Sequence, residues 1–583
     1  MSSAGWLDPS ELRIGLGCMR LATDESVDEE LALATIAAAA HAGITVFDTA
    51  RAYGRGEDGL GAGERLLARA LRRSGHERAA RIVTKGGMTR AGGAWLPDGR
   101  AKSIAADCEA SLGALDGLPI DLYLLHAPDP RTPWRTSVRA LARLAEHGLV
   151  SRIGVSNVTR GQLDEALALA PIAAVEVALS ADDDRAVRGG VLERCAELGI
   201  ALIAHSPLGG PRRAGALARR GPWAGVALAH EASPAEVALA WLLALSPAVI
   251  AIPGARTPAT AQSAARAARL TLGAGDRAAL PGTAAVSAGA RRGPTKQRDD
   301  AEVLLVMGIP GAGKTRVAEG YAARGYLRLN RDERGGGLRE LAGALAEELA
   351  AGTRRVVLDN TYLSRAARSY VIDAASGQGI PTRCLWLDTP LAHAQVNLVE
   401  RLLERFGDLP GPEELRTLAR TTQGVLTPTS QMRTARELEP PVAEEGFAGV
   451  EVVPFARSEP PDGVPGGVYV AAAALRAPGW ERAVKRGDPE APHLVFDWIP
   501  EGAADALDPS VAELTAAVSG PVHRALCPHA AGPPRCWCRP PLPGLPLAFA
   551  RAHGLAPSRS VVVGAGPAHR TLAAALGARY LAV

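Results

Sequence analysis

The chain has 583 residues, with 65 lysines and arginines, 62 aspartates and glutamates, and a formal net charge of +3. This balance excludes a protein that is drawn to nucleic acid or to membranes by its overall charge, and at roughly 150 residues per domain the length predicts three or four domains. No stretch approaches the roughly 18 uninterrupted apolar residues of a membrane-spanning helix, so we expect no membrane contact.

The N-terminal residues 1–15 contain no basic region followed by an apolar one, which predicts a cytoplasmic protein rather than a secreted one. Seven cysteines are too few to form a disulfide framework for a chain of this length. Five lysines stand against sixty arginines, so each lysine is a candidate for a role that arginine cannot fill. Two of the five, Lys85 and Lys314, lie inside the strongest motifs.

From residue 12 to about 275, short apolar runs alternate with alanine-rich helical patterns. Eight such runs, each followed by helix-like sequence, predict an α/β fold of the (β/α)8 TIM-barrel type, which needs about 250 residues. The active site of such a barrel lies at the carboxyl ends of the strands. We therefore assign residues 1–284 to a barrel and residues 285–300, which lack both periodicities, to a linker. The predicted strands lie within 13–21, 44–50, 81–87, 121–129, 151–157, 173–180, 200–207 and 248–255.

Four polar side chains end or closely follow three consecutive predicted strands, so we expect them to meet at the barrel mouth. A tyrosine with an ordinary pKa of about 10 works as an acid near neutrality when an ammonium lies close by, itself held by a carboxylate. An imidazole could then orient a carbonyl substrate beside the tyrosine. The four residues are Asp48, Tyr53, Lys85 and His126.

The segments FDTARAYG, TKGG, LLHAPD and IGVSN, which carry these four residues and Ser156 and Asn157, resemble motifs of the aldo-keto reductase superfamily. The resemblance covers roughly residues 12–275 and implies NADPH-dependent reduction of a small carbonyl compound. It implies that Tyr53 is the general acid, that Lys85 and Asp48 tune it, and that His126 orients the carbonyl. It further implies that the nicotinamide carboxamide is held by Ser156 and Asn157, and the adenosine 2'-phosphate by Arg256.

Three positions depart from the family pattern, and all three concern the cofactor. Glu176 stands where relatives commonly have a glutamine, and a carboxylate accepts hydrogen bonds without donating them. His205 replaces the aromatic ring that stacks on nicotinamide, and Ser263 and Ala264 replace a Glu-Asn pair that contacts adenine. These departures leave a second class of function open, in which the barrel senses NADPH without turnover.

A second α/β domain is expected over residues 301–457. The segment Gly308 to Thr315, GIPGAGKT, follows an apolar run and opens a helical pattern, as in a P-loop. The backbone N–H groups of such a loop cradle phosphates, and its glycines, Gly311 and Gly313 included, permit the turn. Lys314 is expected to neutralise the β- and γ-phosphates of ATP, and Thr315 to bind Mg²⁺.

The segments YLRLNRDERGG, VVLDNTYLSRAARSYV and NLVERLLERF resemble polynucleotide 5'-hydroxyl kinases. The resemblance implies that Asp332 accepts the proton of the attacking hydroxyl. Arg401 and Arg405, one helical turn apart, are expected to act as lid arginines around ATP. Arg365 and Arg368 are candidates for contacts with the phosphates of the acceptor, with a solvated basic face as the alternative.

The acceptor of this kinase is the less defined part of the prediction. Residues 301–457 carry 19 basic and 20 acidic side chains, so they lack the basic stripe of a tight duplex binder. A short single-stranded 5' end therefore fits better than a duplex. A small-molecule hydroxyl remains the alternative, since Gly335 to Gly337 leave few side chains to hold a substrate phosphate.

Residues 458–583 are expected to form a smaller α/β domain. Its Cys/His spacing suits one structural Zn²⁺, with unliganded thiols as the alternative, and CPHAAGPPRCWCRPPLPG resembles the zinc loop of haloacid-dehalogenase-type phosphatases. The positions where that family carries a nucleophile, a lysine and a magnesium ligand are apolar here, at 471–474, Pro540 and Ala565. We therefore expect an inactive domain, with Asp497 as the single substitute nucleophile to consider. The predicted zinc ligands are Cys527, His529, Cys536 and Cys538.

Together these segments predict a bifunctional enzyme, a carbonyl reductase fused to an ATP-dependent 5'-hydroxyl polynucleotide kinase that acts in the repair of nucleic-acid ends. The alternatives are an NADPH-sensing barrel that regulates a P-loop kinase of a small-molecule hydroxyl, and a scaffold in which only the kinase acts.

Overall fold

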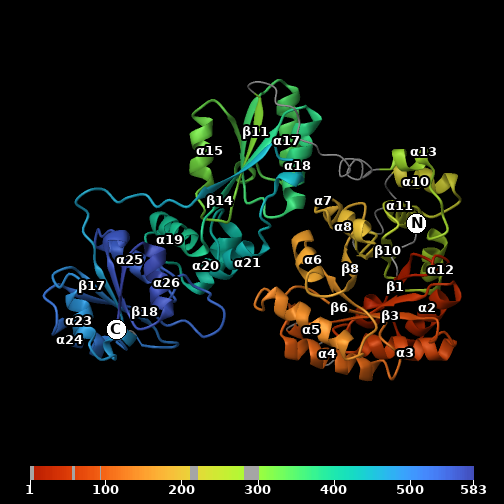
Figure 1. The fold of residues 1–583 in the computed structure, drawn as a ribbon, viewed down its shortest axis with the longest axis horizontal. Coiled ribbons are helices and arrows are strands. Elements are labelled where there is room, and N and C mark those ends of the chain that lie inside the picture. Colours follow the sequence, from red (N-terminus) through yellow and green to blue (C-terminus); the bar gives the residue numbers. More distant parts are fainter. Residues whose placement is uncertain (1–5, 56–58, 92–93, 211–220, 281–300, 504) are drawn as a thin grey trace. The chain divides into compact units, whose positions relative to one another are not determined.

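The computed structural model describes residues 6–55, 59–91, 94–210, 221–280, 301–503 and 505–583 (Figure 1). The chain divides into two compact units, Met1–Arg292 and Gly293–Val583. The predicted linker, residues 285–300, lies outside the described residues. Within the part of the chain that is described, no helix combines the length and the apolar character needed to cross a bilayer.

The first unit contains a sheet of eight parallel strands, whose order in the sheet is their order along the chain. A parallel bridge between Ile14 and Ala251 joins the first strand to the last, so the sheet closes. This arrangement confirms the predicted (β/α)8 barrel, with a strand in each of the eight predicted segments. The strands are β1 (Gly15–Gly17), β2 (Val46–Asp48), β3 (Arg81–Gly86), β6 (Leu122–Leu125), β7 (Ile153–Ser156), β8 (Ile172–Ala178), β9 (Ala201–His205) and β10 (Val249–Ile252).

The barrel strands are short apolar runs because both of their faces are covered. Side chains such as Val83, Leu124 and Ile203 fill the interior, while Phe47, Tyr123 and others pack outward against the helices. The helices are α1 (Met19–Thr23), α2 (Glu29–His41), α3 (Ala62–Ser74), α4 (Ala101–Ala114), α5 (Trp134–Glu146), α6 (Arg160–Leu167), α7 (Arg185–Arg188), α8 (Val191–Leu198), α10 (Gly221–Ala229), α11 (Pro234–Ala244), α12 (Pro258–Ala267) and α13 (Ala274–Ala279).

An antiparallel hairpin, β4 (Met88–Ala91) and β5 (Ala94–Pro97), follows β3 at the active-site end of the barrel. The sequence analysis did not predict it, because the segment is short and its strand residues are not strictly alternating. The hairpin supplies a side chain to the candidate site described below.

The second unit begins with a five-stranded parallel sheet in the order β12-β13-β11-β14-β15. Its central strand β11 leads directly into the glycine-rich loop, as predicted, whereas β12 and β15 were not predicted. The strands are β11 (Glu302–Met307), β12 (Leu327–Leu329), β13 (Arg355–Asp359), β14 (Thr382–Asp388) and β15 (Gly449–Pro454). The helices are α15 (Lys314–Ala322), α16 (Arg331–Arg334), α17 (Leu338–Ala350), α18 (Arg365–Gly377), α19 (Leu391–Phe406), α20 (Pro412–Thr421), α21 (Pro428–Glu437) and the 3₁₀ turn η2 (Ala443–Glu445).

A third parallel sheet, ordered β18-β17-β16-β19-β20, completes the second unit. Four of its five strands lie in the apolar runs GVYVAAAAL, HLVFDWIP, SVVVGAG and ARYLAV, whose composition predicts strands. The fifth, β18, was missed because its sequence, VHRALC, mixes polar and apolar residues at the sheet edge. The elements are β16 (Val468–Ala471), α22 (Ala472–Leu475), α23 (Trp480–Lys485), β17 (His493–Trp498), α24 (Asp508–Thr515), β18 (Val522–Cys527), α25 (Gly544–Ala552), η3 (Pro557–Arg559), β19 (Val561–Gly564), α26 (Pro567–Leu576) and β20 (Arg579–Ala582).

The two sheets of the second unit share a hydrophobic cluster. Residues of α19 such as Val399 and Leu403 belong to the same cluster as Phe496 of β17 and Leu547 of α25. Trp537, which is 1% exposed, donates its indole N–H to the carbonyl oxygen of Leu426 at 3.0 Å. The third sheet therefore packs against the segment between β14 and β15 of the P-loop sheet.

Candidate functional sites

The barrel brings the four predicted polar residues together around one cavity. Asp48 ends β2 and Lys85 lies on β3, while His126 directly follows β6. Tyr53 lies in the turn after β2, where it is 6% exposed. With the exception of Lys85, whose side chain is fully buried, all of them line a cavity of about 310 Å³.

A buried ion pair lies beneath this cavity. The Lys85 ammonium lies 2.5 Å from Asp48 Oδ1 and 3.1 Å from the Thr49 carbonyl oxygen. A second carboxylate oxygen, Oε2 of Glu176, lies 3.2 Å from the same nitrogen. Burial alone would lower the pKa of Lys85, but the two carboxylates outweigh it and raise this pKa above its ordinary value.

The tyrosine and histidine lie edge to face, with ring centroids 5.7 Å apart. Burial raises the pKa of Tyr53 above its ordinary value, and Lys85, 5.3 Å from the centre of its ring, opposes that shift. Burial also lowers the pKa of His126, so this imidazole is neutral near neutrality. His126 Nδ1 has no hydrogen-bond partner among the described residues, and a neutral pair of hydroxyl and imidazole suits polarisation of a carbonyl oxygen.

Trp95 of β5 completes the cavity and was missed by the sequence analysis. Its ring lies 5.9 Å from that of Tyr53 and 6.0 Å from that of His126, measured between centroids. It is 38% exposed and stacks on the guanidinium of Arg90 at 4.1 Å. The signal available in the sequence was a tryptophan in a segment to which no helix or strand was assigned.

Of the two side chains predicted to hold a carboxamide, Asn157 lines the cavity and Ser156 is buried beside it in the chain. Asn157 has φ of 57°, and its Nδ2 donates to the His126 carbonyl oxygen at 3.0 Å and to Ser156 Oγ at 3.1 Å. His205 Nε2 lies 3.1 Å from Asn157 Oδ1. Burial lowers the pKa of His205 to about 4, so it is neutral and can present its ring face to a ligand.

A second cavity of about 430 Å³ continues from the first, since Arg20, Leu208, Pro253 and Gly254 line both. Arg256, Ser263 and Ala264 line this second cavity. The Arg256 side chain is 46% exposed and lies 3.4 Å from Asp24, so most of its donors face solvent. The continuous groove therefore joins the Tyr53 site to an exposed guanidinium.

In the second unit, the predicted P-loop connects β11 to α15. Gly308, Gly311 and Gly313 all have positive φ, and a Cβ at Gly311 would lie 2.3 Å from the Ala394 carbonyl oxygen. Lys314 Nζ donates to the carbonyl oxygens of Gly308 and Ile309 at 3.0 Å each. Burial, followed by the charge of Arg401, lowers the pKa of Lys314 to about 8.

The P-loop borders a cavity of about 610 Å³. Gly311, Gly313 and Arg401 line it, while Thr315 is exposed at the start of α15. Arg405 points instead to the Gln423 carbonyl oxygen, to which it donates at 3.1 Å. The structure therefore brings Arg401, and not Arg405, to this cavity.

Asp332 lies on the short helix α16, and its side chain is 49% exposed beside Arg331 at 3.0 Å. Asn330 caps this helix, accepting from the backbone N–H of Asp332 at 2.6 Å. The side-chain amide of Gln423 donates to the Asp332 carbonyl oxygen. Two anchors therefore hold the backbone of Asp332 and leave its carboxylate accessible.

Asp359 and Asn360, at the carboxyl end of β13, were not assigned by the sequence analysis. Asp359 is 2% exposed and pairs with Arg328 at 3.1 Å, and it acts electrostatically on Lys314. Asn360 Nδ2 is buried without a hydrogen-bond partner among the described residues. The aspartate that follows the apolar run VVL was the sequence signal that could have identified this position at the end of a strand.

The prediction that Arg368 contacts the phosphates of the acceptor is wrong. The side chain is fully buried and pairs with Glu445 through two hydrogen bonds of 2.7 and 2.6 Å, and it also donates to the carbonyl oxygens of Tyr362 and Glu439. A guanidinium held in this way cannot contact acceptor phosphates, so its role is structural. Arg365, which is half-buried at the start of α18, remains the candidate for contacts with the phosphates of the acceptor.

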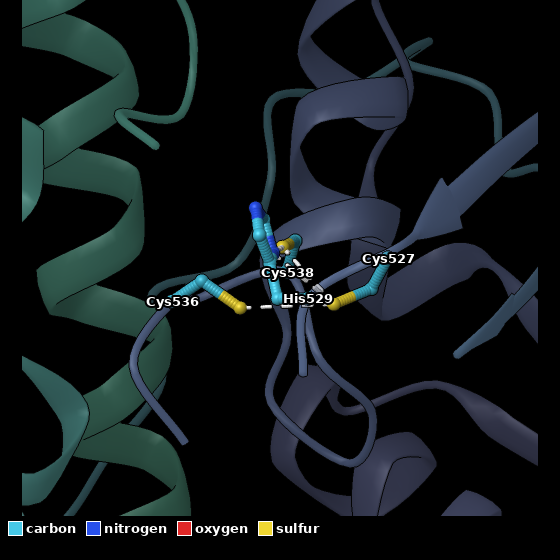
Figure 2. A group of neighbouring side chains, drawn as sticks. All are labelled: Cys527, His529, Cys536 and Cys538. Atoms are coloured by element: carbon cyan, nitrogen blue, oxygen red, sulfur yellow. Dashed lines mark hydrogen bonds between the residues drawn. The ribbon is translucent and has the colours of Figure 1, made fainter. Parts of the chain in front are cut away.

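The third sheet carries the Cys/His cluster at the end of β18 and in the loop that follows it. Figure 2 shows the four side chains converging on one point, and their ligand atoms all lie within 4.8 Å of one another. The Cys527 Sγ lies 3.4 Å from His529 Nδ1 and 3.7 Å from Cys536 Sγ, and Cys538 Sγ lies 3.2 Å from His529 Nδ1. Three thiols and one imidazole at these separations fit a tetrahedral Zn²⁺.

The carboxyl ends of the same sheet offer little for catalysis. Ala471 ends β16 and is buried, and Ala565 follows β19 at the surface. Asp497, near the end of β17, lies 3.9 Å from Arg476. Among the described residues at these strand ends, Asp497 is the acidic side chain that could act as a nucleophile.

Family models match two segments of the chain. One, described as "Aldo/keto reductase family", matches residues 13–280, and another, described as "AAA domain", matches residues 303–415. "Probable aldo-keto reductase 1" of Glycine max is 32% identical over 274 residues, which span 42% of this chain and 76% of the soybean protein. An uncharacterized oxidoreductase of Schizosaccharomyces pombe is 32% identical over 248 residues, again with 42% and 76% covered.

Two solved structures also resemble the first unit. A thermostable aldo-keto reductase in complex with epalrestat is 29% identical, with a TM-score of 0.39, and covers 46% of this chain and 93% of its own. An aldo-keto reductase from Klebsiella pneumoniae in complex with NADPH is 26% identical, with a TM-score of 0.39 and coverages of 46% and 88%.

Proposed function

Because this chain belongs to the aldo-keto reductase family through residues 13–280, we propose that its barrel reduces a small carbonyl substrate with NADPH. The observation that supports this most directly is the meeting of Asp48, Tyr53 and His126 around one cavity above the buried Lys85. NADPH, when bound, supplies the hydride for the carbonyl carbon. The chain itself supplies the proton and the groups that orient the substrate.

In this proposal Tyr53 donates its hydroxyl proton to the carbonyl oxygen. The Lys85 ammonium, held by Asp48 at 2.5 Å, stabilises the phenolate that remains. His126 orients the carbonyl oxygen from the opposite side as a neutral imidazole. Trp95 lines the same cavity and offers an aromatic surface to the substrate.

The groove beyond the cavity provides the cofactor site. His126 Nδ1, beside the Tyr53 cavity that opens into this groove, is buried without a hydrogen-bond partner among the described residues, as expected where a polar ligand binds. Ser156 and Asn157 are placed to hold the carboxamide. Arg256, with donors facing the second cavity, suits the 2'-phosphate of NADPH.

Steady-state oxidation of NADPH in the presence of a panel of aldehydes and ketones tests this proposal. Turnover with any carbonyl supports the enzyme. NADPH binding without turnover across the panel would support the sensor function instead. Absence of NADPH binding would support the alternative in which the barrel is a scaffold and only the kinase acts.

For the second unit we propose ATP-dependent phosphorylation of a 5'-hydroxyl polynucleotide end. A P-loop with Lys314 beside its phosphate cradle supports the use of ATP, and an accessible carboxylate at Asp332, anchored through its backbone, suits a base that takes the proton of the attacking hydroxyl. Thr315 would bind the Mg²⁺ and Arg401 would face the transferred phosphate. Comparison of 5'-hydroxyl oligonucleotides with nucleosides and sugars as acceptors separates this proposal from a small-molecule kinase.

For the third sheet we propose a haloacid-dehalogenase-like domain that has lost phosphatase activity and retains a structural Zn²⁺. The purified chain is expected to contain about one zinc per molecule, because the ligand atoms of three thiols and one imidazole lie within 4.8 Å of one another. Cys536→Ser is expected to lose the metal and to lower the melting temperature of the second unit, as measured by metal analysis and calorimetry. Cys384→Ser, which changes a buried cysteine far from the cluster in sequence, is the matched control and should keep the zinc.

The same preparation is expected to hydrolyse neither 3'-phosphorylated ends nor sugar phosphates. Zinc-free protein that melts like the zinc-bound form would refute a structural metal. Phosphatase turnover that disappears in Asp497→Asn would overturn the proposed loss of activity.

A further inference from the structure

Lys85, Asp48 and Glu176 form a buried cluster with one positive and two negative groups. Their exposed fractions are 0%, 2% and 3%, and both carboxylates lie within 3.2 Å of the same ammonium nitrogen. One ammonium neutralises one carboxylate, so full ionisation leaves an excess negative charge that is shielded from water. Carboxyl groups in such an environment respond by binding a proton.

The groups around the cluster do not supply a second positive charge. His126 and His205 are neutral because burial lowers the pKa of each. Tyr53 and Cys18 are neutral because burial raises the pKa of each. Further out, the cations carry their own carboxylate partners: Arg185 pairs with Asp183 at 2.6 Å, and Arg20 pairs with Asp24 at 2.6 Å.

Both carboxylates of the cluster, Asp48 and Glu176, line the cavity, as does Asn157. Glu176 Oε2 lies 3.2 Å from the Lys85 ammonium nitrogen. Burial, followed by the charge of Glu176, raises the pKa of Asp48 to about 8. The shared environment therefore favours one proton on the pair of carboxyl groups through neutral pH.

We propose that the Asp48–Glu176 pair binds one proton at neutral pH and thereby gives the cavity a hydrogen-bond donor for the carboxamide oxygen of the nicotinamide. This inference rests on NADPH being the cofactor, as proposed above. A protonated carboxyl group both donates and accepts, as the glutamine side chain does. In this proposal the Asp48–Glu176 pair therefore offers the carboxamide both a donor and an acceptor.

The sign of the pH dependence follows from the raised pKa of the pair. The proton is present below about pH 8 and is lost as the pH rises through that value, which leaves a second negative charge facing the carboxamide oxygen. Affinity for NADPH should therefore be constant near neutrality and fall by up to about tenfold per pH unit above pH 8. Binding in that upper range should take up about one proton.

Isothermal titration of the full chain with NADPH, from about pH 6.5 to about pH 9.5 in buffers of different ionisation enthalpy, measures both affinity and proton uptake. We expect at least a tenfold loss of affinity in the wild type across this range, with proton uptake above pH 8. Glu176→Gln should bind NADPH with nearly constant affinity and no uptake in the same range. Asp48→Asn, which also leaves one carboxylate for one ammonium, should flatten the profile in the same way.

Glu64→Gln is the matched control, because Glu64 is a fully buried glutamate that binds Thr84 and does not line the cavity. It should keep the wild-type profile. The inference is wrong if wild type and Glu176→Gln show the same profile, or if both variants that remove a carboxylate keep the proton uptake. Absence of NADPH binding in the wild type would instead overturn the proposed cofactor.

Discussion

Tyr53→Phe is expected to lower kcat for carbonyl reduction by about 10²–10⁴-fold, the usual contribution of a general acid. The affinity for NADPH should stay nearly unchanged, because the hydroxyl donates its proton only as negative charge develops on the substrate oxygen. The ring itself packs edge to face with Trp95 and His126, and phenylalanine preserves those contacts. Single-turnover NADPH oxidation and equilibrium cofactor titration measure the two quantities separately.

Tyr123→Phe provides the control, since Tyr123 is a fully buried barrel tyrosine whose ring packs against the outer helices. This variant should keep the wild-type rate. A Tyr53→Phe enzyme that retains more than a tenth of the wild-type rate would exclude Tyr53 as the acid.

Lys85→Met should also remove most of the carbonyl reductase activity and displace the pH optimum of the activity that remains, because the ammonium opposes the raised pKa of Tyr53.

The barrel and its polar residues were predictable because both depend on local sequence. Strands buried on two faces must be apolar, and polar residues such as Asp48 and His126 at their carboxyl ends must meet when the sheet closes. The P-loop was predictable for a similar reason, since its glycines and Lys314 lie within one short segment. In each case the chain order and the fold bring the residues to the same edge.

Features that depend on contacts between distant segments were not predictable. Arg368 follows the strand-end segment DNT in sequence, yet its partner Glu445 is 77 residues away and draws it into the core. Trp95 reaches the barrel mouth only because an unpredicted hairpin carries it there. The raised pKa of Asp48 follows from burial and then from the charge of Glu176 on β8, and no local sequence pattern couples these two residues.

Asp332→Ala is expected to reduce phosphorylation of 5'-hydroxyl oligonucleotides by about 10²–10⁴-fold while leaving ATP affinity nearly unchanged. The reason is its position: Asp332 lies on α16, outside the loop of residues 308–315 that is expected to hold the phosphates. Lys314→Ala should weaken both, because a lost charge-assisted hydrogen bond to phosphate costs about 1.5–3 kcal/mol, or roughly ten- to a hundredfold in affinity.

Comparison of Asp332→Ala with Lys314→Ala distinguishes a residue that acts on the acceptor from one that binds the nucleotide. Glu333→Ala changes the neighbouring exposed carboxylate on α16 and should retain activity, since Glu333 pairs with Arg328 rather than facing the acceptor. Kinase rates with saturating ATP and equilibrium binding of a fluorescent ATP analogue measure the two effects. Equal losses of ATP affinity in Asp332→Ala and Lys314→Ala would place Asp332 at the nucleotide and leave the acceptor hydroxyl without an assigned base.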